Sequence, residues 1–129
     1  MRRWLALTAA LCLALTIPMP AAAGGTSDPF GGAWKAIDLD GSAMTLAISG
    51  GGPTRHVVIV DVSCGACNPS GYPTVMIGTG EVINDTLYGS GTWHDAPGSN
   101  RTDVWYFEIT YAEGTLTGPF EIQWSRAGN

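Results

Sequence analysis

Residues 105–111, Trp-Tyr-Phe-Glu-Ile-Thr-Tyr, show the clearest periodicity in the chain. Every second residue, starting at Trp105, is a large aromatic or aliphatic one, and Tyr106, Glu108 and Thr110 stand between them. A period of two is that of a β-strand, whose successive side chains point to opposite faces of a sheet. The stretch therefore predicts a strand with one face turned toward a core.

Runs of the same kind lie on both sides of this stretch. Turn residues such as Asp40-Gly41, Gly50-Gly51-Gly52-Pro53 and Asn84-Asp85 separate them. Further strands are expected over residues 33–38, 43–49, 55–62, 74–83, 86–93 and 115–125. Gly78 and Gly80 are expected to bend the strand that contains them. If Pro119 divides the last strand, the chain has eight strands rather than seven.

The fold class follows from these short strands and short connections. No segment shows a helical period, and eighteen glycines fit strands that are joined by tight turns. Because each connection is short enough for a hairpin, sequential antiparallel pairing is the economical topology. We expect an all-β, single-domain antiparallel meander that closes into a small barrel, with a two-layer β-sandwich as the alternative.

Residues 1–23 have the layout of a removable secretory signal peptide. Arg2 and Arg3 precede an uncharged apolar run over residues 4–17, and Ala21-Ala22-Ala23 offers the small side chains that signal peptidase requires. A membrane anchor would need about 20 apolar residues, and this run ends at Pro18. We therefore expect cleavage after Ala23 and a secreted or periplasmic protein that is not inserted in a membrane.

The remaining chain divides into three parts by composition. Residues 24–32 are rich in Gly, Ser and Thr and are expected to form a flexible leader in which only Phe30 could pack. Residues 33–126 form the barrel or sandwich domain, and residues 127–129 form a short tail. Cleavage of 23 of the 129 residues leaves 106, enough for one domain with a modest core.

The charge balance excludes some classes of partner. After cleavage, four Lys and Arg residues face eleven Asp and Glu residues, which gives a net charge of −7. Nucleic acids and anionic membranes both require clustered basic residues. We therefore expect neither of them as a partner.

Cys64 and Cys67 are the two cysteines that remain after cleavage. In an oxidising compartment such a pair is normally a disulfide. The alternatives are a redox-active dithiol, which would need a following helix to activate its first thiol, and a metal site. Asn68-Pro69 follows instead of a helix. We therefore expect a structural disulfide that stiffens its loop.

Aromatic side chains are the main candidates for recognition, because Trp and Tyr combine an apolar face with a polar edge. The tryptophans at 34, 105 and 124 lie on the expected inward faces, where core packing explains them. Tyrosines on outward faces, and a histidine and an aspartate at the end of a strand, are better placed for a ligand. The expected ligand-binding residues are Tyr72, Tyr88, Tyr106, His94 and Asp95.

Signals for catalysis or for a bound metal are weak. No Gly-x-Ser-x-Gly nucleophile motif occurs. A zinc site would need three or four ligands, for instance His56, His94 and Asp95, which the sequence does not bring together. We expect no catalytic residues, no metal site and no cofactor.

Four short sequence motifs are similar to motifs of known proteins. They are Gly-x-Trp at residues 32–34, Asp40-Gly41-Ser42 followed by Met44-x-Leu46-x-Ile48, Gly78-Thr79-Gly80, and Thr115-Leu116-Thr117 leading to Trp124-Ser125-Arg126. This combination resembles a group of small exported bacterial β-proteins with no established activity. Gly-x-Trp on a first strand is also similar to lipocalin-like and avidin-like barrels, which implies a ligand held in the mouth of the barrel.

Together these observations predict an exported non-enzymatic β-domain. It would act as a binding or structural module for a small ligand, a glycan or an extracellular protein, with loops 63–73 and 95–102 turned toward that partner. One alternative is a secreted protease inhibitor whose exposed loop is stiffened by Cys64 and Cys67. Another is a small metal-dependent hydrolase that uses His94 and Asp95.

Overall fold

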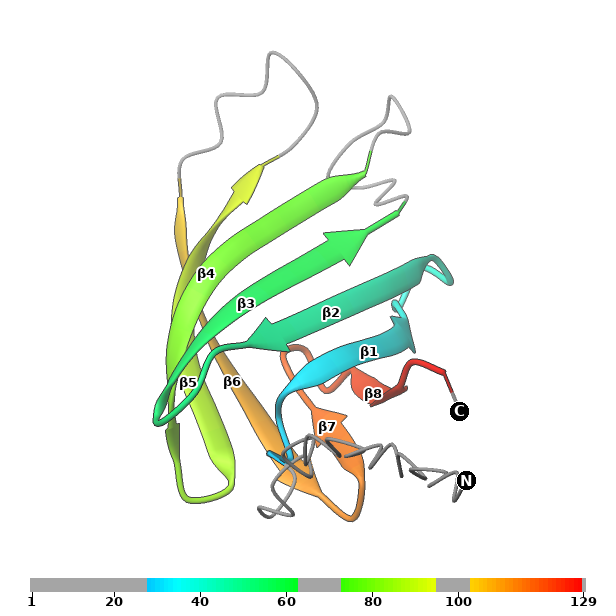
Figure 1. Ribbon diagram of the computed structural model, residues 1–129. Coiled ribbons are helices and arrows are strands. Elements are labelled where there is room, and N and C mark those ends of the chain that lie inside the picture. The colour runs from blue at the N-terminus through cyan, green and yellow to red at the C-terminus, as the bar shows by residue number, and fades with distance from the viewer. Residues whose placement is uncertain (1–27, 63–72, 95–102, 129) are drawn as a thin grey trace, which may run out of the picture.

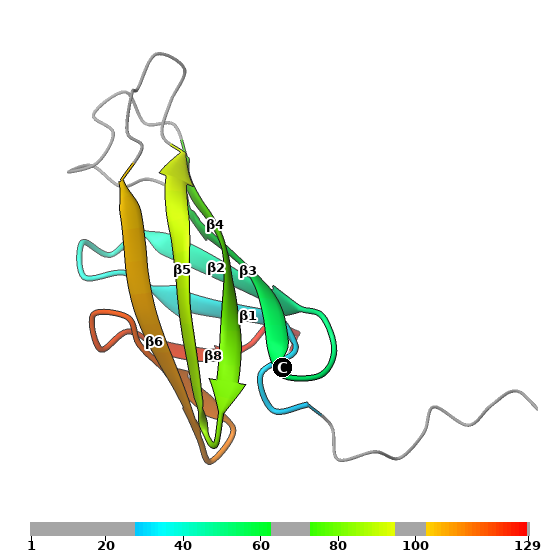
Figure 2. The same ribbon diagram turned by 90° about the vertical axis from the view of Figure 1, so that its left-hand side faces the viewer.

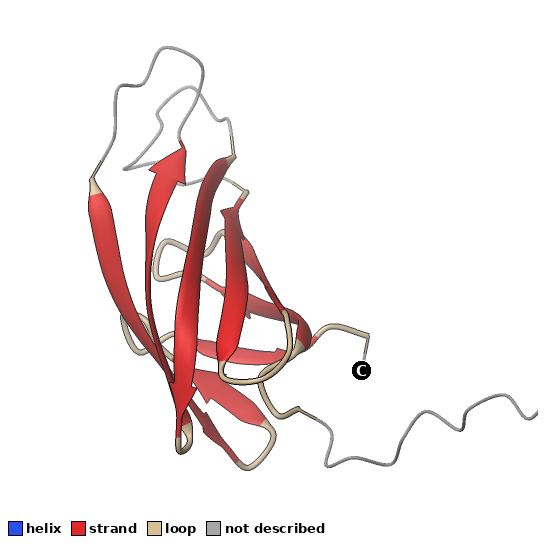
Figure 3. Cartoon of the chain, turned by 60° about the vertical axis from the view of Figure 1, so that its left-hand side comes forward, coloured by secondary structure: helices blue, strands red, loops and turns tan. Residues whose placement is uncertain are grey.

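Eight antiparallel strands make up the computed structural model, which describes residues 28–62, 73–94 and 103–128 (Figure 1). In chain order they are β1 (Gly32–Ile37), β2 (Ala43–Ser49), β3 (Thr54–Asp61), β4 (Thr74–Ile83), β5 (Thr86–His94), β6 (Val104–Ala112), β7 (Thr115–Thr117) and β8 (Gln123–Arg126). Figure 3 shows strands joined by loops and turns. Within the described residues, no helix is long and apolar enough to cross a membrane.

The strands form a meander that closes into a barrel. Each strand pairs with the next one along the chain, and β8 pairs back with β1. The closing junction is short, because only Trp34 with Arg126 and Lys35 with Ser125 lie opposite each other. The predicted all-β meander and its closure into a small barrel are confirmed, and the two-layer sandwich does not form.

The last predicted strand is divided, which gives the alternative with eight strands. Residues 118–122 connect β7 to β8 and include a cis Gly118–Pro119 peptide bond. A hydrogen bond of 2.9 Å from Gly118 N to Ile122 O closes this connection. Phe120 falls within the strand expected over residues 115–125, but it lies in this connection instead. The prediction of a strand was therefore wrong at Phe120.

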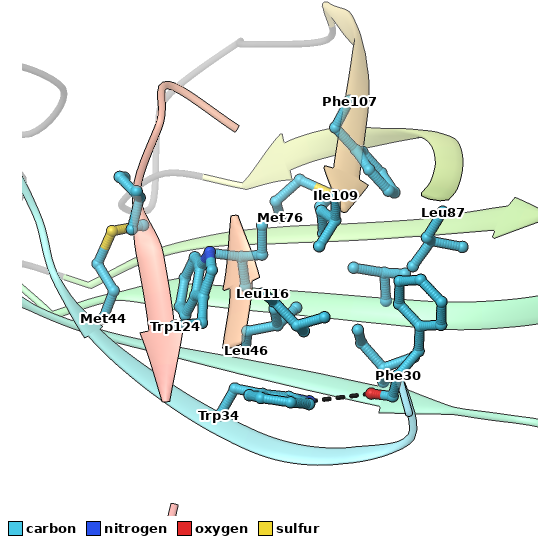
Figure 4. Packing of buried hydrophobic residues seen from close by; sticks show 14 residues of the cluster. Phe30, Trp34, Met44, Leu46, Met76, Leu87, Phe107, Ile109, Leu116 and Trp124 are labelled. Atoms are coloured by element: carbon cyan, nitrogen blue, oxygen red, sulfur yellow. Dashed lines mark hydrogen bonds between the residues drawn. The ribbon is translucent and has the colours of Figure 1, made fainter. Parts of the chain in front are cut away.

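Alternating side chains fill the barrel with a hydrophobic core. Along β2, Met44, Leu46 and Ile48 point inward and are buried, and the residues between them are exposed. Figure 4 shows the buried side chains packed around Leu46 and Trp124. The whole core consists of Phe30, Trp34, Met44, Leu46, Ile48, Val57, Ile59, Met76, Leu87, Phe107, Ile109, Leu116, Ile122 and Trp124.

The two ends of the barrel differ. Phe30 fills one of them, which we call the plugged end, and only 1% of this residue is exposed. The plugged end carries the hairpin turns 50–53, 84–85 and 113–114. We call the other end the mouth. It carries the turn 38–42, the ends of β3 to β6 that rise to the top of Figures 1 and 2, and the connection 118–122.

The flexible leader expected over residues 24–32 needs correction for its described part. From Asp28 onward the chain docks against the barrel, and Gly32 already belongs to β1. Trp34 Nε1 donates a hydrogen bond of 2.9 Å to Phe30 O (Figure 4). The ring of Phe30 also lies 6.1 Å from the ring of Tyr111, centroid to centroid. Phe30 is ordered because the closed barrel offers it an apolar lumen.

Two arginines fasten this docked segment. The guanidinium of Arg126 lies over the ring of Trp34, 4.0 Å from its centroid. It also donates hydrogen bonds to the backbone carbonyl oxygens at positions 28, 29 and 31. Arg55, on β3, pairs through Nε with Asp28 Oδ2 at 3.1 Å. A planar guanidinium can cover a ring and donate to several acceptors at once, which an ammonium group cannot do.

Two cross-strand pairs of glycines allow β4 and β5 to curve around the core (Figure 1). Gly78 lies opposite Gly91, and Gly80 lies opposite Gly89. A Cβ atom on Gly78 would lie 2.8 Å from Gly91 Cα and closer still to the carbonyl oxygen of Ser90. The two backbones therefore approach more closely than any side chain would permit. The bend that Gly78 and Gly80 predict thus involves both strands.

Replacing Gly78 with Ala is expected to destabilise the protein by about 1–3 kcal/mol, because the new methyl group must push β4 away from β5. Gly51→Ala is the matched control, since nothing lies within 4 Å of a Cβ atom at that position. The control should stay within about 0.5 kcal/mol of the wild type. Urea unfolding measures both values, and equal unfolding midpoints for the two variants would contradict the close approach.

Arg126→Lys is expected to destabilise the protein by about 1–2 kcal/mol, because a lysine cannot cover Trp34 and also satisfy the carbonyl groups of the docked segment. Hydrogen exchange of the Trp34 indole N–H, followed by NMR, should become faster as the docked segment loosens. Gln123→Ala, an exposed change on the same strand, is the control. If exchange and stability are the same in both variants, Arg126 does not fasten the plug.

Candidate functional site

Half-buried aromatic side chains line the mouth of the barrel. Trp93, near the end of β5, and Trp105, near the start of β6, pack against the core, with their ring centroids 5.6 Å apart. Phe120, from the connection 118–122, stacks on Trp105 at 5.4 Å with an angle of 24° between the rings. We call Trp93, Trp105 and Phe120 the mouth cluster. Its inner side rests on the core through Phe107, whose ring lies 5.9 Å from that of Trp105.

The backbone at Phe120 has a conformation that bulky residues rarely adopt. Its φ is 55°, and that of the neighbouring Glu121 is 61°, both in the left-handed region. For a residue with a Cβ atom, this backbone conformation raises the free energy of the folded state by about 1–2 kcal/mol. The strain leaves Phe120, an apolar residue, 64% exposed at the mouth. Strain of this kind clusters at functional sites, where it holds a group in place.

The next part of the rim is polar. Ser42 Oγ, in the turn 38–42, donates a hydrogen bond of 2.9 Å to Asp61 Oδ1 at the end of β3. Thr74, at the start of β4, is the register partner of Asp61. All three side chains are buried, with exposed fractions of 9%, 4% and 0% for Ser42, Asp61 and Thr74. We call these three residues the polar wall.

The hydroxyl group of Thr74 has no hydrogen-bond partner among the residues that the structure describes. Its Oγ1 is buried, and the described residues offer it neither a donor nor an acceptor. A buried group of this kind costs about 1–3 kcal/mol when it stays unpaired. Met76 follows Thr74 by two residues on β4, and its register partner is Trp93. The hydroxyl therefore lies between the carboxylate of Asp61 and the mouth cluster.

A groove opens at one side of the mouth. It arises because β1 and β8 pair only as far as Lys35, so the end of β1 stands apart from the connection 118–122. The space has a volume of ≈ 710 Å³, which is in the range of small-molecule sites. Its apolar lining residues are Ala36, Ile37, Leu39, Ala43, Met44 and Ile122, and its polar ones are Lys35, Thr45, Glu121, Gln123 and Ser125. The groove therefore lies beside the mouth cluster and the polar wall, and its lining includes none of their residues.

Tyr88 and Tyr106, two of the predicted binding residues, lie together on the outer face of the barrel. Tyr88 is opposite Glu108 and Tyr106 is opposite Ser90, so the tyrosines are diagonal neighbours on β5 and β6. They are 43% and 78% exposed. Both line the same two hollows, of ≈ 430 and ≈ 470 Å³. Their role in ligand binding stays a prediction.

Of the other predicted binding residues, the structure describes His94. Tyr72, Asp95, Cys64 and Cys67 fall outside the described residues, so the predicted disulfide stays a prediction. His94 is exposed at the end of β5. It therefore stands at the rim of the mouth rather than beside the two tyrosines.

The two histidines do not share a metal site. His56 lies opposite Thr79 and His94 lies opposite Val75, on the two sides of β4. Four residues of strand, about 13 Å, and two strand spacings, about 10 Å, therefore separate them. In the part of the chain that the structure describes, no group of three or more His, Cys, Asp and Glu side chains could hold a metal ion. A zinc site that uses both histidines does not form.

Several residues of the mouth were not singled out by the sequence patterns. Trp105 was expected in the core, but it is only half-buried, whereas Trp34 and Trp124 are fully buried. Asp61 could have been found, because an acidic residue follows Val57 and Ile59 at the inward positions of an apolar strand. Phe120 carried no such signal, because its place depends on the turn and not on alternation.

Comparisons with known proteins add no further identification. No known protein family, no curated protein and no solved structure matches the chain. What the protein does is therefore inferred from the geometry of the mouth and of the outer face.

Thr74→Val is expected to stabilise the unliganded protein by about 1–2 kcal/mol, because it replaces an unpaired buried hydroxyl with a methyl group of similar size. Thr79→Val is the matched control, since Thr79 is exposed on the outer face of the same strand. Thermal unfolding of both variants measures the effect. A loss of stability in Thr74→Val would show that the hydroxyl is already satisfied.

Proposed function

We propose that the chain is an exported, non-enzymatic binding protein whose barrel mouth holds a small ligand with a flat, apolar part. The observation that carries this proposal is the mouth cluster. Trp93 and Trp105 face inward and are half-buried, and Phe120 is held over Trp105 at the cost of backbone strain. Aromatic faces in this arrangement stack well on a flat ring.

The barrel supports such a site because it is rigid before the ligand arrives. Trp93 and Trp105 stand on adjacent strands whose register is set by seven consecutive residue pairs. Phe120 is fixed by the hydrogen bonds that close the connection 118–122. A site whose side chains are already placed loses little entropy when it binds. Barrel mouths are also among the common places for small-molecule sites.

The layout of residues 1–23 supports export. Ser42 is hydrogen-bonded to Asp61 and not to a histidine. A serine in that pairing lacks the base that a hydrolase would need to activate it.

A second candidate function is glycan binding on the outer face. It is favoured by one observation, the joint lining of two hollows by Tyr88 and Tyr106. Glu81, Glu108 and Ser90 lie around the two rings, and these groups accept hydrogen bonds from sugar hydroxyls. Tyrosine rings that lie on a sheet face stack on the apolar side of a sugar.

The mouth is tested by titration with N-phenyl-1-naphthylamine, a neutral aromatic dye that fluoresces in apolar sites. Wild-type protein is expected to bind the dye, and Trp105→Ala should weaken binding about tenfold or more, because the central ring of the cluster is lost. Tyr106→Ala, the neighbouring aromatic residue on the opposite face of β6, is the matched control and should leave the affinity unchanged.

Two results would overturn this assignment. If the dye does not bind, or if both variants bind it as the wild type does, the mouth is not the site. A glycan array on the same three proteins separates the second candidate. A sugar that binds the wild type and Trp105→Ala, but not Tyr106→Ala, would assign the function to the outer face.

A further inference from the structure

We infer that the ligand of the mouth is an aromatic amine, with its ring on the mouth cluster and its ammonium group at the polar wall. This inference rests on the proposed function and adds the chemistry of the ligand's polar end. It starts from the hydroxyl of Thr74, which is fully buried and has no partner among the described residues. A buried polar atom left unpaired in a native fold requires an explanation, and a bound group supplies one.

The positions of the mouth cluster and the polar wall match a ring joined to a short polar arm. Thr74 is a diagonal neighbour of Trp93 on the inward face of β4 and β5, since Trp93 lies opposite Met76. Diagonal neighbours lie about 7–8 Å apart. Asp61 is directly opposite Thr74 on the other side. A ring stacked on the mouth cluster therefore places a side arm of two carbons at the hydroxyl and the carboxylate.

An ammonium group fits two members of the polar wall, Thr74 and Asp61. It carries three donors and no acceptor, whereas a hydroxyl oxygen and a carboxylate both accept. One ammonium group can therefore donate to Thr74 Oγ1 and to Asp61 together. The hydrogen bond from Ser42 Oγ fixes the orientation of the Asp61 carboxylate. Donors that bear a charge also make the stronger hydrogen bonds.

The charges around the mouth favour a cation in the same way. Acidic residues of the described chain at this end are Asp38, Asp40, Asp61, Asp103 and Glu121, and the cation among them is Lys35. Arg55 and Arg126 lie at the plugged end instead. A recess whose charges are mainly of one sign attracts ligands of the opposite sign. The aromatic faces of the mouth cluster add to this attraction, because they favour cations.

The test is isothermal titration calorimetry at neutral pH with three probes that share an indole ring. Tryptamine carries an ammonium group, tryptophol a neutral hydroxyl and indole-3-acetate a carboxylate. The wild type is expected to bind tryptamine about tenfold or more tightly than tryptophol, and indole-3-acetate most weakly. Asp61→Asn should remove the preference for tryptamine, and Thr74→Val should reduce it about threefold or more.

Thr79→Val, on the outer face of the same strand, is the control and should keep the full preference. The comparison of the three probes on the wild type decides the question even if Asp61→Asn does not fold. Equal affinities for the three probes, or a preference for tryptophol or indole-3-acetate, would overturn the inference that the ligand is an amine and leave the proposed function intact. If the neutral dye binds but none of the three indoles does, that inference also fails and the proposed function stands. Failure of the dye and of all three indoles would overturn the proposed function itself.

Discussion

The short junction between β1 and β8 determines the shape of this barrel. Two register pairs close the sheet, and one of them joins Trp34 to Arg126. Trp34 is fully buried and holds Phe30, while Arg126 covers its ring and binds the docked segment. The residues that close the sheet therefore also seal one end of it. Because the junction ends at Lys35, the same few contacts leave the groove open at the other end.

Most of the fold could be predicted from local patterns. In an antiparallel strand with one buried face, apolar and polar residues alternate along the sequence, and Gly, Asp and Asn mark the turns between strands. The observed bounds of β2 and β4 agree with residues 43–49 and 74–83. The docking of Phe30 could not be predicted in this way. It depends on a lumen and on Arg126, which lies far along the chain, and a single aromatic residue in a glycine-rich segment has no period.

The candidate site was less predictable than the fold for a related reason. Alternation tells which face a side chain occupies, but not how far along the barrel axis it lies. Trp105 and Phe107 share a face, yet one is half-buried at the mouth and the other is in the core. The contact of Asp61 with Thr74 depends on the register of β3 and β4. The lack of a partner for the Thr74 hydroxyl within the described residues depends on all of its neighbours together, and no local pattern contains that information.

Phe30 closes one end of the barrel, and this has a consequence for the ligand that we propose. A molecule bound at the mouth would leave by the route through which it entered, so its residence time would depend on the residues of the mouth. The end of the ligand that enters last would point outward into solvent. Such a site would bind one end of a larger molecule as well as a small free molecule.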